Sequence, residues 1–318
     1  MTDETSRVIL FVFAGRKPNM ELQIPFAKKI LEENPNVDYH VWNLSREQID
    51  NKYLQTIIGE RITVFNEYQK FTPGYDEVYK HYADTKFKKN IFVKLDDDIV
   101  FVQTKKFKQF VEEIYSNPDT VVSANVINNG ACTPLEKGIW EKFSNLGIPL
   151  LDVHKSAKYA HEAHNYFFQN YTKMLQQKIK TIPTNDWLSI NTIGYNWEMG
   201  KKISEIVGTR YDKKTIVAGR QLLDLGDEGV VNTLPRAIVQ GFLVAHLTFG
   251  PQKLTDSQLK QWRKLYSAIS SHYLENDQDA ISEIEKILSQ KTHLNSANEW
   301  RSRWSGKEKD PTEGFYTP

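Results

Sequence analysis

The chain has 318 residues, of which 40% are hydrophobic and 25% are charged, the balance of a folded globular protein. Its 41 Lys and Arg residues against 40 Asp and Glu residues give a formal net charge of +1, which excludes a strong overall attraction to nucleic acid or to an anionic membrane. A single cysteine, Cys132, excludes an intrachain disulfide and a cysteine-rich zinc site. We therefore expect a reducing compartment, the cytoplasm (the host cytoplasm if the source is a virus). No apolar run is long enough to predict a transmembrane segment.

The first half of the chain alternates between short apolar runs and amphipathic segments. The apolar runs predict strands over 7–13, 37–42, 61–65 and 90–95. Between them, apolar residues at helical spacing predict a helix from Asn19 to Pro35 and two more over 46–58 and 75–84. This alternation predicts an α/β fold, with a Rossmann-like, mainly parallel central sheet that is flanked by helices. Ligands of such sheets bind at the carboxyl ends of the strands.

The second half is less regular. Its predicted elements are a strand over 121–127, a helix over 156–180, a strand that ends at His246, and two amphipathic helices over 255–290 that separate near Glu275-Asn276-Asp277. The tail beyond about residue 300 is charged and contains Pro and Gly. We expect that tail to be a surface strap or to be disordered.

Three consecutive carboxylates, Asp96-Asp97-Asp98, end the strand predicted over 90–95, and an apolar run resumes directly after them. Like charges on adjacent residues repel, and Asp96 and Asp98 point to the same side of an extended chain. A divalent cation would offset that repulsion, because carboxylate oxygens suit Mg²⁺ or Mn²⁺, whose other positions are filled by water and substrate phosphate. A solvated turn, or a helix start with acids in its first turn, is the alternative. The apolar residues on both sides favour the metal.

Six blocks of sequence occur in an order that resembles a poorly characterised family of glycosyltransferase-like proteins from microbes, fungi and viruses. The blocks are AGRKPNM, KLDDDIVFV, SANVINN, LSIN, DEGVVNTLP and AHLTFGPQ. KLDDDIVFV is similar to the DxD signature of fold-type-A (GT-A) glycosyltransferases, in which an acidic motif holds the metal and the diphosphate of a nucleotide sugar. The resemblance implies a GT-A-like nucleotide-sugar-binding and catalytic domain over 1–252, with C-terminal helices and a tail over 253–318 packed on it.

The resemblance assigns the metal and nucleotide sites. Asp96 and Asp98 are the expected metal ligands, and His246 is the expected third, since a neutral imidazole suits Mn²⁺; a buried core histidine is the alternative for His246. Arg16 offers a cation to phosphate, and Gly15 allows close approach of the backbone, unless the two only form a tight turn. The expected nucleotide-binding residues are Ala14, Gly15, Arg16, Lys94, Asp96 and Asp97.

Acidic and amide side chains later in the chain are candidates for catalysis and for sugar binding. In inverting GT-A enzymes a carboxylate deprotonates the acceptor hydroxyl, a role that the resemblance gives to Asp227 or Glu228, with a slight preference for Asp227. Acids in the first turn of a helix are the alternative for this pair. Amide and aromatic groups suit sugars, although turn asparagines and core aromatics are common. The expected substrate-binding residues are Asn125, Asn128, Trp187 and Asn191.

The sequence therefore predicts a metal-dependent, inverting glycosyltransferase that moves a sugar from a nucleotide-diphosphate sugar, most simply a UDP-sugar, to a hydroxyl acceptor. The acceptor is a glycan, a protein or a modified DNA base, for which lysines in 86–89 and 105–110 would contact the phosphate backbone. A Mg²⁺-dependent nucleotidyltransferase is the competing enzyme class, but the chain has no GxxxxGK loop. A non-catalytic nucleotide- or sugar-binding protein is the alternative outside the enzymes. The oligomeric state is left open.

Overall fold

The computed structural model describes residues 6–71, 74–209, 211–212, 214–222 and 227–289. Within them, the strands are β1 (Val8–Ala14), β2 (Val37–Asn43), β3 (Ile62–Phe65), β4 (Ile91–Asp96), β5 (Ile99–Val102), β6 (Val121–Ile127), β7 (Lys180–Pro183), β8 (Thr192–Asn196), β9 (Ile216–Val217), β10 (Arg220–Gln221) and β11 (Arg236–His246). The helices are α1 (Lys17–Glu33), α2 (Gln48–Thr56), α3 (Tyr75–Tyr82), α4 (Phe107–Ser116), α5 (Lys137–Ser144), α6 (Ala157–Met174), α7 (Trp197–Ile206), α8 (Asp256–Glu275) and α9 (Asp279–Ser289).

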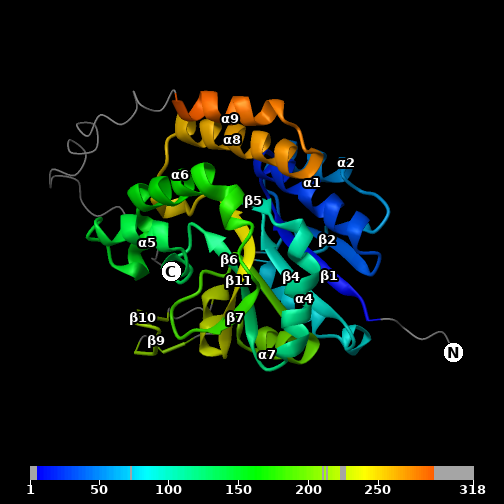
Figure 1. The fold of residues 1–318 in the computed structure, drawn as a ribbon. Coiled ribbons are helices and arrows are strands. Elements are labelled where there is room, and N and C mark those ends of the chain that lie inside the picture. Colours follow the sequence, from blue (N-terminus) through cyan, green and yellow to red (C-terminus); the bar gives the residue numbers. More distant parts are fainter. Residues whose placement is uncertain (1–5, 72–73, 210, 213, 223–226, 290–318) are drawn as a thin grey trace.

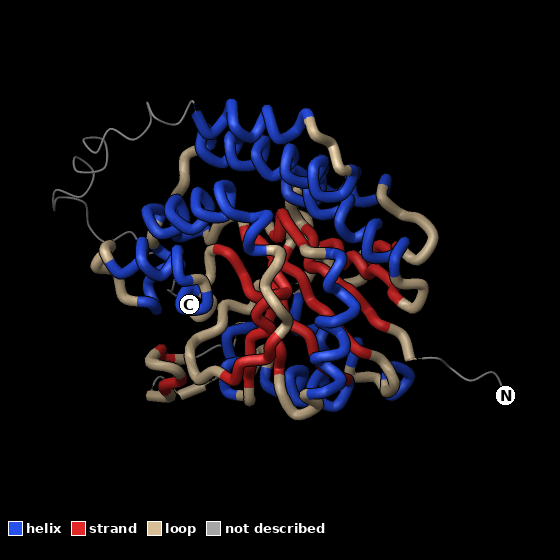
Figure 2. Tube along the Cα trace, viewed as in Figure 1, coloured by secondary structure: helices blue, strands red, loops and turns tan. Residues whose placement is uncertain are grey.

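A nine-stranded sheet forms the centre of the molecule, with helices on both of its faces (Figures 1 and 2). Its strand order is β3-β2-β1-β4-β8-β6-β11-β5, and β7 pairs with β11. Strands β3, β2, β1 and β4 are parallel, as are β6 and β11, whereas β8, β5 and β7 run in the opposite direction. The expected α/β fold with a mainly parallel, helix-flanked sheet is confirmed, with these reversed strands as an addition.

Parallel strands that are covered on both faces need apolar side chains at every position, which explains why the early strands were predictable. Residues 8–12 of β1 are all buried, and so are residues 91–95 of β4. The strand predicted over 121–127 has those same bounds as β6. The sequence did not predict β8, which has the short polar sequence TIGYN and pairs antiparallel with both β4 and β6.

The later elements depart from the sequence predictions in length. The helix predicted over 156–180 ends at Met174, and Lys180 already begins a strand. Strand β11 ends at His246 as expected, but it is eleven residues long. The break between α8 and α9 is confirmed: Asn276 ends α8 in the left-handed conformation, with φ 57°. The tail beyond residue 300 lies outside the described residues.

Helices α8 and α9 lie against the top of the molecule in Figure 1, where α8 packs on α1 and β5. Two aromatic residues of α8 contact His164 of α6. The ring of Trp262 lies 4.3 Å from the His164 ring, centroid to centroid, and the Tyr266 hydroxyl is 2.6 Å from His164 Nδ1. Helices α8 and α9 thus share one core with the sheet. None of the helices in the described part of the chain is long and apolar enough to cross a membrane.

Replacing Gly194 in β8 tests how tightly this strand is packed. A Cβ at this position would lie 2.2 Å from Ile114 Cδ1 in the core, so we expect Gly194→Ala to destabilise the fold by about 1–3 kcal/mol through overpacking. Gly250→Ala is the matched control, because its Cβ would meet nothing within 4 Å. Urea unfolding of the two variants should show a loss for Gly194→Ala alone. Equal unfolding midpoints would contradict the packing described for β8.

Candidate functional site

The Asp triplet lies in the tight turn that joins β4 to β5. Asp96 is the last residue of β4, and β5 begins at Ile99. The Gln23 side-chain amide in α1 donates to the Asp96 carbonyl at 2.7 Å and to the Ile99 carbonyl at 3.1 Å, and the Tyr39 hydroxyl donates to Gln23 Oε1 at 2.8 Å. The turn is therefore fixed by buried hydrogen bonds from the neighbouring helix and strand.

Arg16, in the turn after β1, neutralises two of the three carboxylates. Asp97 accepts the Gly15 N–H at 3.1 Å and Arg16 Nε at 3.0 Å, and Arg16 Nη2 lies 2.9 Å from Asp98 Oδ2. Burial would lower the pKa of the guanidinium, but Asp98 and Asp97 beside it raise that pKa above its ordinary value. The Arg16 side chain is 51% exposed, against 9% for Asp97 and 6% for Asp98. Its cation thus lies at the solvent boundary of the site, and the turn that holds it follows Ala14, the last residue of β1.

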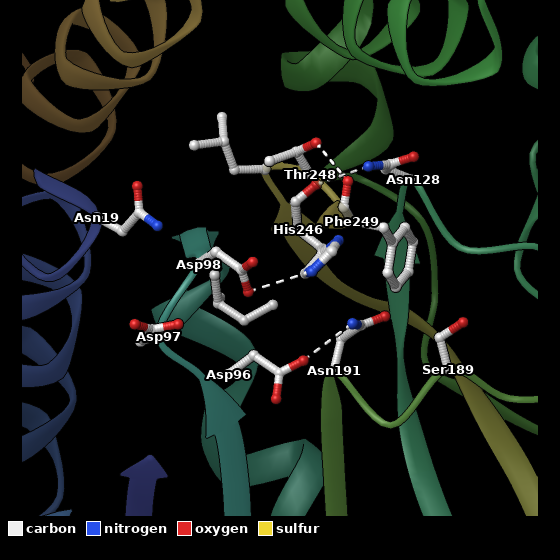
Figure 3. Close-up of polar contacts among 12 residues, drawn as sticks. Asn19, Asp96, Asp97, Asp98, Asn128, Ser189, Asn191, His246, Thr248 and Phe249 are labelled. Atoms are coloured by element: carbon white, nitrogen blue, oxygen red, sulfur yellow. Dashed lines mark hydrogen bonds and ion pairs between the residues drawn. The ribbon is translucent and has the colours of Figure 1, made fainter. Parts of the chain in front are cut away.

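Asp96, Asp98 and His246 form the one group of three potential metal ligands in the described part of the chain, with ligand atoms within 4.8 Å of one another (Figure 3). His246 ends β11, which runs parallel to β6 and in the same direction as β4. Its Nε2 lies 3.1 Å from Asp98 Oδ1. Burial would raise the pKa of Asp98, but His246 and Arg16 lower it below its ordinary value. The carboxylate is therefore held ionised inside the protein.

Two buried atoms of this group have unused hydrogen-bonding capacity. His246 Nδ1 has no hydrogen bond to any described residue, and among the described residues the one partner of Asp98 Oδ1 is His246 Nε2 at 3.1 Å. Leaving a buried polar atom unsatisfied typically costs about 1–3 kcal/mol. A divalent cation coordinated by Asp98 and His246, with Asp96 as third ligand, would remove that cost. Carboxylate oxygens with one imidazole nitrogen are a donor set that suits Mn²⁺, and the oxygens alone suit Mg²⁺.

A buried lysine connects Asp96 to Glu228. Lys94 Nζ lies 2.5 Å from Asp96 Oδ1, 3.0 Å from Glu228 Oε1 and 2.7 Å from the Ile190 carbonyl. The Tyr79 hydroxyl donates to Glu228 Oε1 at 2.6 Å. Burial would lower the pKa of Lys94, but Asp96 and Glu228 raise it, so the amine stays charged. Burial also raises the pKa of the Glu228 carboxyl, an effect that Lys94 opposes.

The two acids of the Asp227-Glu228 pair have different surroundings. Glu228 begins the 3-10 helix η5 (Glu228–Thr233) and joins the Lys94 group. Asp227 is exposed, and its Oδ1 accepts the Gly229 N–H at 2.7 Å, which caps η5. The structure therefore brings Glu228 into contact with the carboxylate cluster and gives Asp227 the local capping role that the sequence left as an alternative.

Among the expected substrate-binding asparagines, Asn191 reaches the cluster. Its Nδ2 donates to Asp96 Oδ2 at 3.0 Å, and its carbonyl accepts the Asp96 N–H at 2.8 Å. Asn129 donates to Asn191 Oδ1 at 3.1 Å. The two amides therefore orient Asp96 from the side of β8.

Asn125 and Asn128 are completely buried and bonded within the protein. Asn125 Nδ2 donates to Glu136 Oε1 at 2.6 Å. Asn128 has a φ of 68° and exchanges two hydrogen bonds with the Gln252 amide, at 3.0 and 2.8 Å. These contacts stabilise the loop after β6, and a direct role of either amide in sugar binding stays a prediction.

Trp187 lines a pocket of about 250 Å³ next to the cluster. The other lining residues are Gly130, Ala131, Leu150, Leu151, Val153, His154, Asp186, Ser189 and Ala218. The guanidinium of Arg220 lies 4.7 Å from the Trp187 ring centroid and 2.9 Å from His154 Nε2. The Phe249 ring lies 4.2 Å from the His246 ring and 6.3 Å from the His154 ring, so one aromatic side chain links the pocket to the metal ligands.

Sequence reasoning missed three residues in or beside the site. Gln23 and Asn19 are buried and four residues apart on the core-facing side of α1, so polar residues on an apolar helical face were the available signal. Tyr79 contacts Glu228 from α3, and nothing in its local sequence distinguishes it from a core tyrosine.

No protein-family model matches the chain, and no curated protein sequence matches it. Among solved structures, two of the galactosyltransferase LgtC are similar to this one. A complex with donor and acceptor sugar analogs gives a TM-score of 0.40, and an active-site mutant gives 0.38; each match has 8% sequence identity and covers 82% of this chain and 95% of the other.

Replacing Arg16 tests the electrostatics of the Asp triplet. Arg16→Met removes the cation from two buried carboxylates, and because the guanidinium is half exposed and partly screened we expect a loss of about 1–3 kcal/mol in the free energy of unfolding. Arg7→Met is the control, since its partner Asp38 is a single carboxylate that is 26% exposed, and the change should cost at most about 1 kcal/mol. Chemical denaturation measures both. An Arg16→Met loss no larger than that of the control would contradict the assigned charge balance.

Proposed function

We propose that the protein is a metal-dependent glycosyltransferase that moves a sugar from a nucleotide-diphosphate sugar to a hydroxyl acceptor. The observation that carries the proposal is the group Asp96, Asp98 and His246 at the carboxyl edge of the sheet, with His246 Nδ1 buried and without a hydrogen bond to any described residue. Ligands of open α/β sheets bind at this edge. A Mg²⁺ or Mn²⁺ ion held by so few protein ligands has positions left for phosphate oxygens.

The proposed metal, when bound, neutralises charge on the leaving diphosphate. Arg16 supports the same task, because its guanidinium is half exposed beside Asp98 and can donate to a phosphate oxygen. We propose that the backbone at Ala14 and Gly15 forms the adjoining wall of the nucleotide site, since the Gly15 N–H is bonded to Asp97. A UDP-sugar is the donor to test first.

We propose Glu228, in preference to Asp227, as the general base of an inverting transfer. Lys94 and Tyr79 hold its Oε1, and Oε2 has no hydrogen bond to any described residue. The pKa of Glu228 is raised, which brings it closer to the value that suits a proton acceptor at neutral pH. The base of an inverting enzyme takes the proton from the attacking hydroxyl, so the free oxygen would face the acceptor.

We propose that the acceptor is a sugar whose ring enters the pocket beside Trp187. The volume, about 250 Å³, suits a single ring, and the lining combines apolar walls with the polar side chains of Asp186, His154 and Ser189. Burial, together with Arg220, lowers the pKa of His154 to about 4, so its imidazole is neutral at physiological pH.

A DNA acceptor has less support. Residues 86–89 precede β4 and residues 105–110 follow β5, whereas the Asp triplet lies between the end of β4 and the start of β5. Both groups of lysines therefore lie at the edge of the sheet opposite the metal ligands, where they could not flank an acceptor bound at the site.

Asp98→Ala tests the proposed metal site. We expect the wild type to release nucleoside diphosphate from a UDP-sugar only with Mn²⁺ or Mg²⁺, and Asp98→Ala to lose both this turnover and the stabilisation by Mn²⁺ in a thermal-shift assay, because a ligand that binds the folded state raises its stability. Asp119→Ala, an exposed residue at the opposite edge, is the control. Release of sugar 1-phosphate, the leaving group when the nucleotidyl group is transferred, would indicate the nucleotidyltransferase class, and metal-dependent binding without turnover would indicate a binding protein.

Glu228→Gln and Asp227→Asn separate the two candidate bases. Loss of a general base typically lowers the rate about 10²–10⁴-fold, and we expect that fall in kcat for Glu228→Gln, with donor KM nearly unchanged. Asp227→Asn should keep transfer within a few fold, since its carboxylate caps η5. NMR of the product would show inversion at the anomeric carbon. The reverse order of the two variants, or retention, would refute this assignment.

A further inference from the structure

We infer that Lys94 is a positioning residue that holds the metal ligand Asp96 and the base Glu228 at a fixed separation. The inference rests on the proposed function, because it concerns what these two carboxylates need in order to act together. Its basis is the placement of one charged amine between them, inside the protein and behind the ligand-binding edge.

The ammonium group of Lys94 uses its full hydrogen-bonding capacity inside the chain. An ammonium has three N–H donors, and Nζ has three acceptors within 3.0 Å: Asp96 Oδ1, Glu228 Oε1 and the carbonyl of Ile190. The side chain is 1% exposed. Lys94 was expected among the nucleotide-binding residues, but no donor is left for a phosphate, so its effect on the nucleotide is indirect.

Lys94 joins three parts of the chain, two of which carry carboxylates that would otherwise repel one another. Asp96 ends β4, Glu228 begins η5, and Ile190 precedes β8. Two carboxylates that approach one another in a buried site cannot both ionise easily unless a cation lies between them. The Phe13 ring, 5.3 Å from Nζ, covers the ammonium from the side of β1 and adds a favourable cation–π contact.

The arrangement fixes each carboxylate through Lys94 and one further residue, and it leaves oxygen lone pairs available for the proposed function. Asp96 is held at Oδ1 by Lys94 and at Oδ2 by Asn191, and both oxygens keep lone pairs for a metal. Glu228 is held at Oε1 by Lys94 and Tyr79, so rotation of the carboxylate is restricted while Oε2 remains available. The distance between the metal and the proton acceptor is therefore set by the same amine.

A double-mutant cycle on transfer tests the inference. We expect Lys94→Met at saturating Mn²⁺ to lower kcat at least about 10²-fold with donor KM within a few fold, because the base loses its orientation and no donor contact is removed. In the Glu228→Gln background the same substitution should lower kcat by less than about threefold, since no base is left to misplace. Lys106→Met is the control, because that half-buried amine bonds the Gln177 carbonyl away from the cluster.

A lysine with a merely structural role would lower kcat by the same factor in both backgrounds, and a direct nucleotide contact would raise donor KM; either result overturns the inference. The melting temperatures give a second cycle. Lys94→Met should lower the melting temperature sharply, and adding Glu228→Gln should recover much of the loss, because one cation and one anion are then removed together.

The stability cycle decides the case if Lys94→Met alone does not fold. Recovery of a folded protein in Lys94→Met/Glu228→Gln supports the inference, and failure of the double variant to fold overturns it. Failure of the proposed function has a different signature. If Glu228→Gln alone transfers at the wild-type rate, the assigned base is wrong, whereas the melting-temperature cycle still reports whether Lys94 holds the two carboxylates.

Discussion

The structure is governed by the need to hold several carboxylates together in a site with little access to solvent. Asp96, Asp97, Asp98 and Glu228 converge at one edge of the sheet, and two permanent cations are placed among them. Arg16 serves Asp97 and Asp98 from the solvent side, and Lys94 serves Asp96 and Glu228 from the core side. The cluster is left with an excess of negative charge beside a buried imidazole nitrogen, His246 Nδ1, that has no hydrogen bond to any described residue; a divalent cation would satisfy both.

The fold supplies the rigidity that such a cluster needs. The strands β1, β4 and β11 deliver Arg16, the Asp triplet and His246 from three separate stretches of sequence to the same edge. Strand β8 runs in the opposite direction, so its first residue, Thr192, and Asn191 before it meet the end of β4. Helix α8 also reaches this border, since Arg263 donates to Asn19 Oδ1 at 3.0 Å in the first turn of α1.

The sequence was informative where local chemistry decides the structure. Continuous apolar runs identify strands that are buried on both faces, and the ends of parallel strands converge by topology. The meeting of Asp98 with His246 was implied by the resemblance to GT-A glycosyltransferases. Lys94 carried a signal that was not fully used: a lysine inside the buried strand segment IFVKL must have a partner. That partner, Glu228, lies far along the chain, and only the fold shows that it, and not its neighbour Asp227, reaches the lysine.

The central claim is that Asp98 and His246 hold a divalent cation that binds a nucleoside diphosphate. Crystals grown with Mn²⁺ and UDP, measured at the manganese absorption edge, test it most directly. The account predicts an anomalous peak within bonding distance of Asp98 and His246, with the diphosphate on the same ion and Arg16 beside it. A Mn²⁺ peak elsewhere on the protein, or UDP bound at this edge without metal, would contradict it.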